Sequence, residues 1–379
     1  MDRPIKKVLY FTNVFPSYRK ELWKALLSLE KIKFSIYFSQ KEFQGIGASS
    51  IDSFFTKAEK EKLYSIKNIN VFGHLLWQRG VLPKLISKEY DSVIFLGDMK
   101  IITNWLGIFI CKIKGKKTAL WTHGVYGNEK SFKKSLRLLF LSLVDDIFLY
   151  ESRAREILMK HKFPINNLHV VYNSINLREQ TKIYKALDFE KKSPNDKYFN
   201  LVFFGRLTKI KKIDLAINAA IQLHKTNKKY KLKIVGNGPQ ETYLKSLVLG
   251  ANAQKFITFE NAKYSEDEIG RMFMESDLLI SPGNVGLNAV HAMTYGTPVL
   301  THGNFNNQMP ECQIIVEEFN GLLHQEDNLS SIQEKVMQWF SSSFKSWERE
   351  KIRNNLIKYY DPIVQAKIFE RVLELNFKE

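Results

Sequence analysis

This 379-residue chain contains only two cysteines and no apolar run long enough to span a bilayer. Cys111 and Cys312 fall in different halves, so we expect neither a disulfide framework nor a zinc site, and a reducing, cytosolic compartment fits best. The longest apolar stretches, "IITNWLGIFI" and "LRLLFLSLV", reach about ten residues, against the roughly 20 that a membrane helix needs. We therefore expect no membrane-spanning segment, and we interpret the amino-terminal "KKVLYFTNV" as a buried strand and not as a signal peptide.

Several motifs are also missing. The chain has no internal repeat and no low-complexity tract, which excludes a solenoid. The turn "VGNGPQ" lacks the full G-x-G-x-x-G spacing, which argues against a dinucleotide-dependent oxidoreductase. No Asp-x-Asp pair follows an expected strand, so the sequence implies no divalent metal and no other cofactor.

The formal net charge of +18 is unevenly distributed along the chain. Up to residue 175 there are 29 Lys and Arg against 15 Asp and Glu, and beyond it 28 against 24. Such a basic half suits a nucleic acid, an anionic membrane surface or an anionic substrate, or it is a solvated face of a lysine-rich protein. No motif that reads nucleic acid is present, so we expect no nucleic-acid partner.

Short apolar runs alternate with amphipathic stretches through most of the chain, which is typical of β-α-β units around parallel sheets. The pattern is interrupted by a charged segment that contains "SPND" and then resumes at "YFNLVFFGRL". We predict an α/β protein with two doubly wound domains, at 1–175 and 198–345, joined by a linker at 176–197. Helices at 346–379 are expected to pack back on the amino-terminal domain, and ligands should bind at the carboxyl ends of the strands, in a cleft between the two sheets.

Three strand ends of the carboxyl-terminal half carry candidate ligand-binding residues. Arg206 and Lys211 stand between an expected strand and a helix, where a guanidinium fork and a mobile ammonium suit a diphosphate. Gly236 and Gly238 form a tight turn one strand later. Surface cations on a basic protein are the alternative interpretation of the first pair.

The third strand end is "SPGNVGLNAVHAM", which contains no carboxylate. Gly283 and Gly286 free the backbone to approach a ligand, and a helix that begins near Leu287 directs its positive end at it. We therefore expect backbone amides to bind an anion here. His291 lies one turn into that helix and is either a ligand contact or a core residue.

In the amino-terminal half, His123 directly follows an expected strand in "LWTHG". Tyr18 and Arg19 follow a Pro-Ser turn and precede a helix. These three side chains are candidates for contacts with an acceptor or a phosphate, although an ordinary helix start explains Tyr18 and Arg19 equally well.

The series "FFGRLTKIKKIDLAI", "LKIVGNGPQ", "SPGNVGLNAVHAMTYGTPVL", "PE" and "NGLL" resembles the retaining nucleotide-sugar glycosyltransferases of family 4. The resemblance covers about residues 199–325 and implies the GT-B architecture of two Rossmann-like domains. It implies that Arg206 and Lys211 neutralise the leaving diphosphate and that His123 lies near the transferred sugar. The implied donor-binding residues are Gly205, Gly236, Gly238, Gly283, Asn284, Val285, Gly286, Leu287, His291 and Glu311.

The chain departs from the family pattern at three positions. Gly283 and His291 stand where relatives carry two glutamates, one near the donor sugar and one near the ribose. Lys212 stands where a glycine is usual. The site for the diphosphate is thus retained, while the recognition of sugar and ribose must differ, so the sequence identifies neither the sugar nor the base.

From the resemblance we expect a retaining glycosyltransferase that uses a nucleotide-diphosphate sugar and a hydroxyl of a glycan or lipid-linked glycan, in surface polysaccharide synthesis. Because both glutamates are missing, a catalytically silent GT-B protein that binds a nucleotide sugar or a partner enzyme is the alternative. The segments "KIKGKK" and "KSFKKSLRLLFLSL" combine cations with an apolar helical face. They predict peripheral attachment to an anionic membrane, at its cytoplasmic face.

Overall fold

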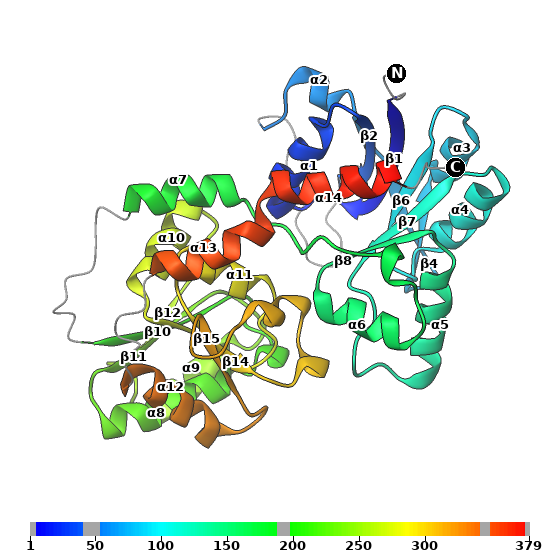
Figure 1. Ribbon diagram of the computed structural model, residues 1–379. Coiled ribbons are helices and arrows are strands. Elements are labelled where there is room, and N and C mark those ends of the chain that lie inside the picture. Colours follow the sequence, from blue (N-terminus) through cyan, green and yellow to red (C-terminus); the bar gives the residue numbers. More distant parts are fainter. Residues whose placement is uncertain (1–4, 41–53, 188–197, 342–348, 376–379) are drawn as a thin grey trace. The chain divides into compact units, whose positions relative to one another are not determined.

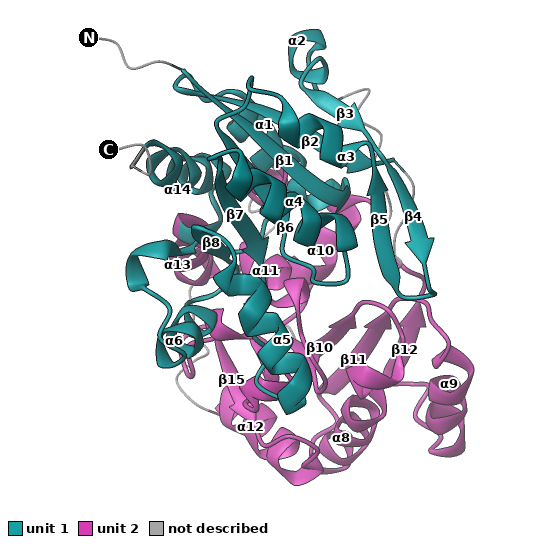
Figure 2. Ribbon diagram, turned by 90° about the vertical axis from the view of Figure 1, so that its right-hand side faces the viewer, with its two compact units in different colours: residues 1–176, 359–379 teal, residues 177–358 magenta. Residues whose placement is uncertain are grey.

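The computed structural model describes residues 5–40, 54–187, 198–341 and 349–375. These residues form two compact units, which Figure 2 colours separately. Unit 1 comprises residues 1–176 and 359–379, and unit 2 comprises residues 177–358. The chain therefore starts in unit 1, completes unit 2 and returns to unit 1 at Tyr359. Residues 188–197 of the expected linker and residues 342–348 lie outside the described residues.

Unit 1 is built on a seven-stranded parallel sheet of order β3-β2-β1-β6-β7-β8-β9 (Figure 1). Buried Val, Ile, Leu and Phe residues fill its central strands, as expected for a sheet covered on both faces. The order reverses between β1 and β6, which is the position where ligands bind in open α/β sheets. The strands are β1 (Lys6–Val14), β2 (Ile32–Ser39), β3 (Leu63–Ser65), β6 (Ser92–Leu96), β7 (Lys117–Thr122), β8 (Asp146–Leu149) and β9 (Leu168–Val170). An antiparallel hairpin is formed by β4 (Lys67–Val71) and β5 (Leu75–Arg79).

Helices cover both faces of this sheet. One face packs on α1 (Lys20–Leu27) and on the last helix, α14 (Pro362–Leu375), whose Phe369 contacts Trp121 and Phe148. The other face packs on α3 (Val81–Ile86), α4 (Ile102–Ile113), α5 (Ser131–Ser142) and α6 (Ser152–Lys160). A short helix, α2 (Lys57–Lys60), precedes β3. The predicted return of a carboxyl-terminal helix to the amino-terminal domain is thus confirmed by α14.

Unit 2 contains a six-stranded parallel sheet of order β12-β11-β10-β13-β14-β15. The order reverses between β10 and β13. The strands are β10 (Phe199–Phe204), β11 (Tyr230–Val235), β12 (Ile257–Glu260), β13 (Leu278–Ser281), β14 (Val299–His302) and β15 (Gly321–His324). Two doubly wound parallel sheets confirm the predicted α/β class.

One face of the unit 2 sheet packs on α8 (Ile213–Thr226), α9 (Glu241–Gly250) and α12 (Leu329–Ser341). The remaining helices are α7 (Leu177–Leu187), α10 (Glu266–Glu275), α11 (Leu287–Thr294) and α13 (Arg349–Tyr360). Helix α7 packs against α10 and α11. The Arg349 guanidinium at the start of α13 donates to the backbone carbonyls of Phe273 and Ser276.

Candidate functional site

The loops that follow β10, β11, β13 and β14 meet at the carboxyl edge of the unit 2 sheet, beside its reversal point. The first two loops pack backbone against backbone. Gly236 has a φ of +150°, and a Cβ there would lie 1.9 Å from the carbonyl oxygen of Gly205. A Cβ on Gly238 would lie 2.4 Å from the carbonyl oxygen of Leu207. Both glycines are therefore required for the two loops to fit together at all, whatever they bind.

Lys211 ends a short 3-10 helix (Lys209–Lys211) in the loop after β10, and its ammonium reaches the loop after β13. Its Nζ donates to the carbonyl oxygen of Asn284 at 2.6 Å. Burial, assisted by the positive charge of Arg206, lowers the pKa of Lys211 to about 8, while the Glu311 carboxylate opposes this shift. The buried Glu311 lies in a 3-10 helix over Pro310–Ile314. The Arg206 side chain is exposed, and its guanidinium has no hydrogen bond or ion pair to any described residue.

Helix α11 begins at Leu287, as the sequence predicted, and Gly286 precedes it with a φ of +59° and a ψ of −151°. Two amides of the preceding loop are already engaged, because Gly283 N donates to Lys211 O at 3.0 Å and Val285 N to Gln308 Oε1 at 3.0 Å. The amides of Leu287 and Asn288 have no acceptor among the described residues. Those two N–H groups lie at the positive end of the helix dipole and are therefore available to an anion.

The Gln308 side chain fixes the loop before α11 by hydrogen bonds, and no pattern in the neighbouring sequence predicted this role. Besides accepting from Val285, the buried side chain donates through Nε2 to Thr301 Oγ1 at 2.8 Å and to the carbonyl of His302 at 3.1 Å. Thr301 Oγ1 in turn donates to Ser281 O at 2.7 Å. The amide thus fixes the ends of β13 and β14 to the loop that precedes α11.

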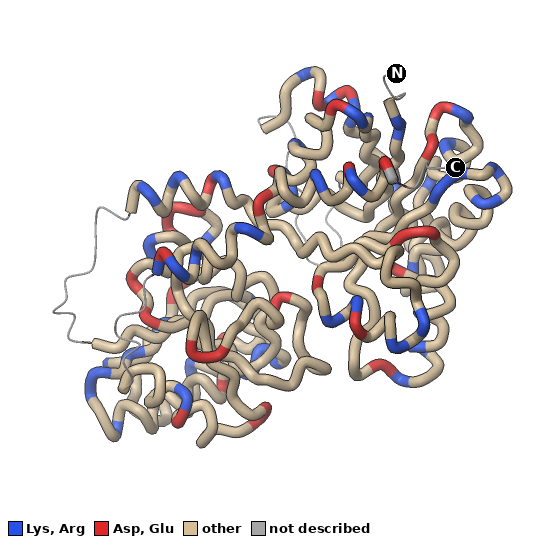
Figure 3. Tube along the Cα trace, viewed as in Figure 1, with Lys and Arg blue, Asp and Glu red and all other residues tan. Residues whose placement is uncertain are grey.

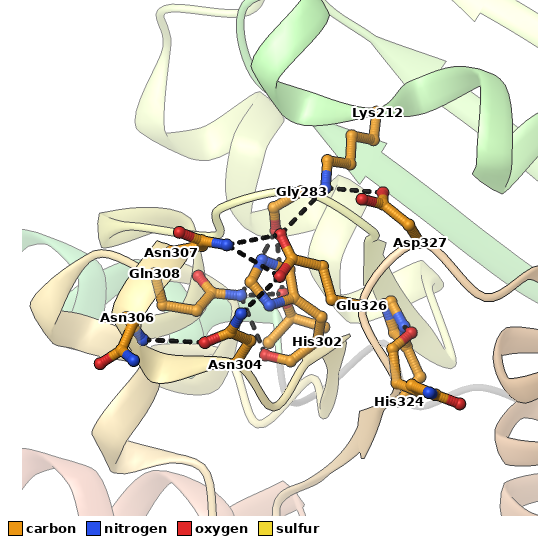
Figure 4. Close-up of polar contacts among 12 residues, drawn as sticks. Lys212, Gly283, His302, Asn304, Asn306, Asn307, Gln308, His324, Glu326 and Asp327 are labelled. Carbon is orange, nitrogen blue, oxygen red and sulfur yellow. Dashed lines mark hydrogen bonds and ion pairs between the residues drawn. The ribbon is translucent and has the colours of Figure 1, made fainter. Parts of the chain in front are cut away.

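Lys212 adopts the left-handed conformation, with a φ of +49°, which a glycine, the residue that the family resemblance implies at this position, adopts without strain. Its ammonium pairs with Glu326 at 3.0 Å and with Asp327 at 2.6 Å, as Figure 4 shows. Glu326 also accepts from Asn304 at 2.6 Å and from Asn307 at 2.9 Å. Although desolvation opposes the shift, the hydrogen bonds from Asn307, Lys212 and Asn304 lower the pKa of Glu326 to about 2. The ion pairs hold the lysine in a conformation that its side chain disfavours.

His291 lies on α11 next to a carboxylate from α10. Its Nε2 is 2.6 Å from Glu266 Oε1, which also accepts from the Tyr295 hydroxyl at 2.7 Å. Burial raises the pKa of Glu266, but the bonds from His291 and Tyr295 outweigh it and the net pKa is lowered. An ionised Glu266 fixes a proton on His291 Nε2 and leaves Nδ1 for other contacts. Glu266 was not predicted from the sequence, because it lies 25 positions before His291 and no local pattern connects the two residues.

We expect His291→Ala to raise the donor Michaelis constant about tenfold with a smaller change in turnover, the pattern of lost uniform binding. Steady-state kinetics with varied donor tests this. His224→Ala is the matched control, since His224 stacks on Phe256 in the same unit. An unchanged Michaelis constant together with a lower melting temperature would identify His291 as a packing residue against Phe204 and Phe273.

Unit 1 has a cavity of about 340 Å³ at the carboxyl ends of β1, β6, β7 and β8. His123, Tyr18 and Arg19, the three candidates from this half, all line it. Burial and the positive charges of Arg19 and Arg137 lower the pKa of His123 to about 3, so the imidazole is neutral. Its ring lies 4.4 Å from that of Tyr150. Lining residues that the sequence analysis did not identify include Asp98, Lys100, Tyr126, Arg137 and Tyr150.

The structure thus gathers the predicted residues into two groups. Arg206, Lys211, Glu311 and the glycines lie at the strand ends of unit 2, with His291 on the adjoining helix. His123, Tyr18 and Arg19 lie together in the cavity of unit 1. Within the described ranges, no group of three or more His, Cys, Asp or Glu side chains could hold a metal ion.

Residues 185–359 match the family described as "Glycosyl transferases group 1". A 165-residue segment is 28% identical to an uncharacterized 41.2 kDa protein in the cps region of Klebsiella pneumoniae. That segment covers 42% of this chain and 41% of the relative's length.

Solved structures with low sequence identity share the fold. A lipopolysaccharide outer core galactosyltransferase, WaaB, matches with a TM-score of 0.72 and 15% identity, over 98% of this chain and 100% of that one. HepE from Anabaena in complex with UDP matches with a TM-score of 0.67 and 14% identity, over 97% and 100%. The pneumococcal O-GlcNAc transferase GtfA, in complex with UDP and GlcNAc, matches with a TM-score of 0.65 and 12% identity, over 99% and 100%. The predicted GT-B fold is confirmed by these matches.

Proposed function

Through residues 185–359 this chain belongs to the group 1 glycosyl transferases, and we propose that it moves a sugar from a nucleotide-diphosphate donor to a hydroxyl of a glycan or lipid-linked glycan. The observation that carries the proposal is the edge of the unit 2 sheet. There Lys211, the exposed Arg206 and two amides of α11 offer positive charge at a single reversal point. This is the environment that a leaving diphosphate requires.

In the proposed reaction, the bond between the anomeric carbon and the diphosphate oxygen breaks. A bond to the acceptor oxygen forms on the same face, so the configuration is retained, and the acceptor's proton passes to the departing oxygen. Charge develops on the diphosphate, so cations and amides that bind it more tightly in the transition state lower the barrier. The protein's own cations supply this charge, and we propose no metal and no other cofactor.

A donor panel tests the proposal. Two of the fold relatives were solved in complex with UDP, so uridine is the first base to try, followed by GDP-, ADP- and CMP-sugars. A donor at 100 times its dissociation constant should stabilise the protein by about 2.7 kcal/mol in a thermal-shift assay. Transfer and hydrolysis assays with the best donor then separate an enzyme from a silent binding protein. Stabilisation by none of the nucleotides would refute the proposal.

The relative in a cps region supports surface polysaccharide synthesis as the process. The described helices include none long and apolar enough to cross a membrane. Helices α4 and α5 of unit 1 instead present apolar side chains to solvent, with Phe109 65% and Phe132 82% exposed. The two helices are neighbours, since the rings of Trp105 and Phe140 lie 4.7 Å apart.

Lysines flank these apolar side chains, at 112, 114 and 117 near α4 and at 130, 133 and 134 near α5, where Figure 3 shows basic segments. Exposed apolar residues that recur every three or four positions on a helix, beside cations, suit an anionic membrane surface. We therefore propose peripheral attachment to the cytoplasmic face of the membrane through this pair of helices, close to a lipid-linked acceptor.

We expect the protein to co-sediment with anionic vesicles at low salt and to be released at high salt, because surface attraction to lysines is screened. Phe132→Ser should weaken partitioning onto the vesicles about tenfold, because the variant lacks an aromatic ring that the membrane would bury. Tyr264→Ser, at an 89% exposed aromatic residue of unit 2, is the matched control. If binding did not depend on lipid charge, or if both variants lost vesicle binding equally, the proposed membrane attachment would be wrong. The basic face would then be an ordinary solvated surface.

A further inference from the structure

Arg19 is a buried cation for which the fold supplies no counter-charge. It is 6% exposed and lines the cavity of unit 1. Its Nη2 donates to the hydroxyl of Tyr150 and to Asn173 Oδ1, the latter at 3.4 Å, while the buried Nε has no hydrogen-bond partner among the described residues. The guanidinium lies over the ring of Trp121, 4.4 Å from its centroid. No carboxylate pairs with it in the part of the chain that the structure describes.

Arg137, which lines the same cavity, shows what the fold does when such a side chain is purely structural. Arg137 is 8% exposed, and its Nε donates to both oxygens of Glu129, at 2.9 and 3.1 Å, while its Nη2 lies 2.8 Å from Oε1. Burying a guanidinium without such a carboxylate is costly, because neutral aromatic and amide groups replace only part of its hydration. The contrast indicates that the counter-charge of Arg19 arrives with a ligand.

The rest of the cavity fits an acidic sugar. Tyr126 and Tyr150 offer aromatic groups, Thr12 and Asn13 offer polar groups, and Lys100 and Lys133 add positive charge. Asp98 is the single carboxylate among the lining residues, and its Oδ1 accepts from the backbone amide of Lys100 at 3.0 Å. His123 is neutral, so it contributes no charge of either sign.

We propose that this cavity binds the acceptor through an acidic group, a sugar carboxylate or a phosphate, that pairs with Arg19. The inference rests on the proposed transferase function and adds the class of acceptor to it. A guanidinium holds either oxyanion through parallel hydrogen bonds, which a neutral hydroxyl group cannot match. Acceptors without the acidic group leave Arg19 unpaired, so the cavity selects against them.

Calorimetric titration of the full chain tests this with D-glucuronate, D-glucose 6-phosphate and D-glucose, each with and without saturating UDP. We expect at least one acid to bind about tenfold or more tightly than glucose, the scale of a hydrogen bond to a charged group. The tighter acid identifies a carboxylate or a phosphate as the recognised group. The preference should be lost in Arg19→Met and kept in Arg79→Met, an exposed arginine of the same unit.

The melting temperature and the UDP affinity show whether Arg19→Met is folded. A second test needs no variant: in the wild type, the preference for the acid over glucose should be lost at high salt. Equal binding of acid and glucose, or a preference that survives Arg19→Met, overturns the inference. Weaker binding of UDP-glucuronate, but not UDP-glucose, by Arg19→Met overturns it too, by placing the acid on the donor. Failure to bind UDP counts against the proposed function, whereas the titrations without UDP still decide the role of Arg19.

Discussion

Replacing Lys211 with alanine should lower turnover by about two to three orders of magnitude, the scale of losing one preorganised group that stabilises developing charge. The half-buried ammonium already reaches the loop before α11, so it needs little rearrangement to meet a leaving diphosphate. Arg206→Ala should have a similar effect, because Arg206 is exposed and unpaired among the described residues. Single-turnover kinetics with saturating donor measures both. Near wild-type rates in both variants would show that the diphosphate does not bind at this edge of the sheet.

The pH dependence of the wild-type activity tests the role of Lys211 without a substitution. Lys211 carries its charge below its pKa of about 8, so kcat/KM of the free enzyme should fall as the pH rises through 8. A bound diphosphate favours the ammonium, so the corresponding fall in kcat should lie at higher pH. Lys211→Arg stays charged throughout and should lose the alkaline fall if it retains activity. A wild-type profile flat to pH 10 would show that this ammonium is not needed.

Placing at position 283 the glutamate that the family resemblance leads us to expect there should inactivate the protein, not improve it. A Cβ on Gly283 would lie 2.1 Å from Ile210 O and 2.7 Å from Lys211 Cα, so any side chain displaces the loop that holds the ammonium. A displacement of about 1 Å costs about 100-fold in rate, so we expect at least that loss in Gly283→Ala and in Gly283→Glu.

Gly250→Ala is the matched control, since a Cβ there meets nothing within 4 Å. Donor turnover and the melting temperature should be measured for all three variants. Wild-type or higher activity in Gly283→Glu would mean that the loop after β10 leaves room for a carboxylate. That result would contradict the expectation, based on the contacts of Gly283, that a side chain does not fit at this position.

The features that could be predicted from the sequence were those with a local pattern of residues. Alternating strands and helices predicted both sheets, and glycines after strands indicated the edge near Lys211 and Leu287 where we propose that the donor binds. The partners of those residues come from far along the chain and carry no local signal. Glu326 lies 114 positions beyond Lys212, and Gln308 lies 23 beyond Val285. The absence of a counter-charge for Arg19 is likewise visible only once the surrounding side chains are placed.

The path of the chain has a consequence for the order in which the protein folds during synthesis. Unit 2 is continuous in sequence, whereas unit 1 waits for α14, whose Phe369 covers Trp121 and Phe148. At about 5–20 residues per second, the ribosome needs about 10–40 s to go from the end of β9 to this helix. During that time, the part of this sheet face that α14 covers, beside α1, is an exposed apolar surface. Chaperones that hold nascent chains therefore have a defined apolar target until the last helix emerges.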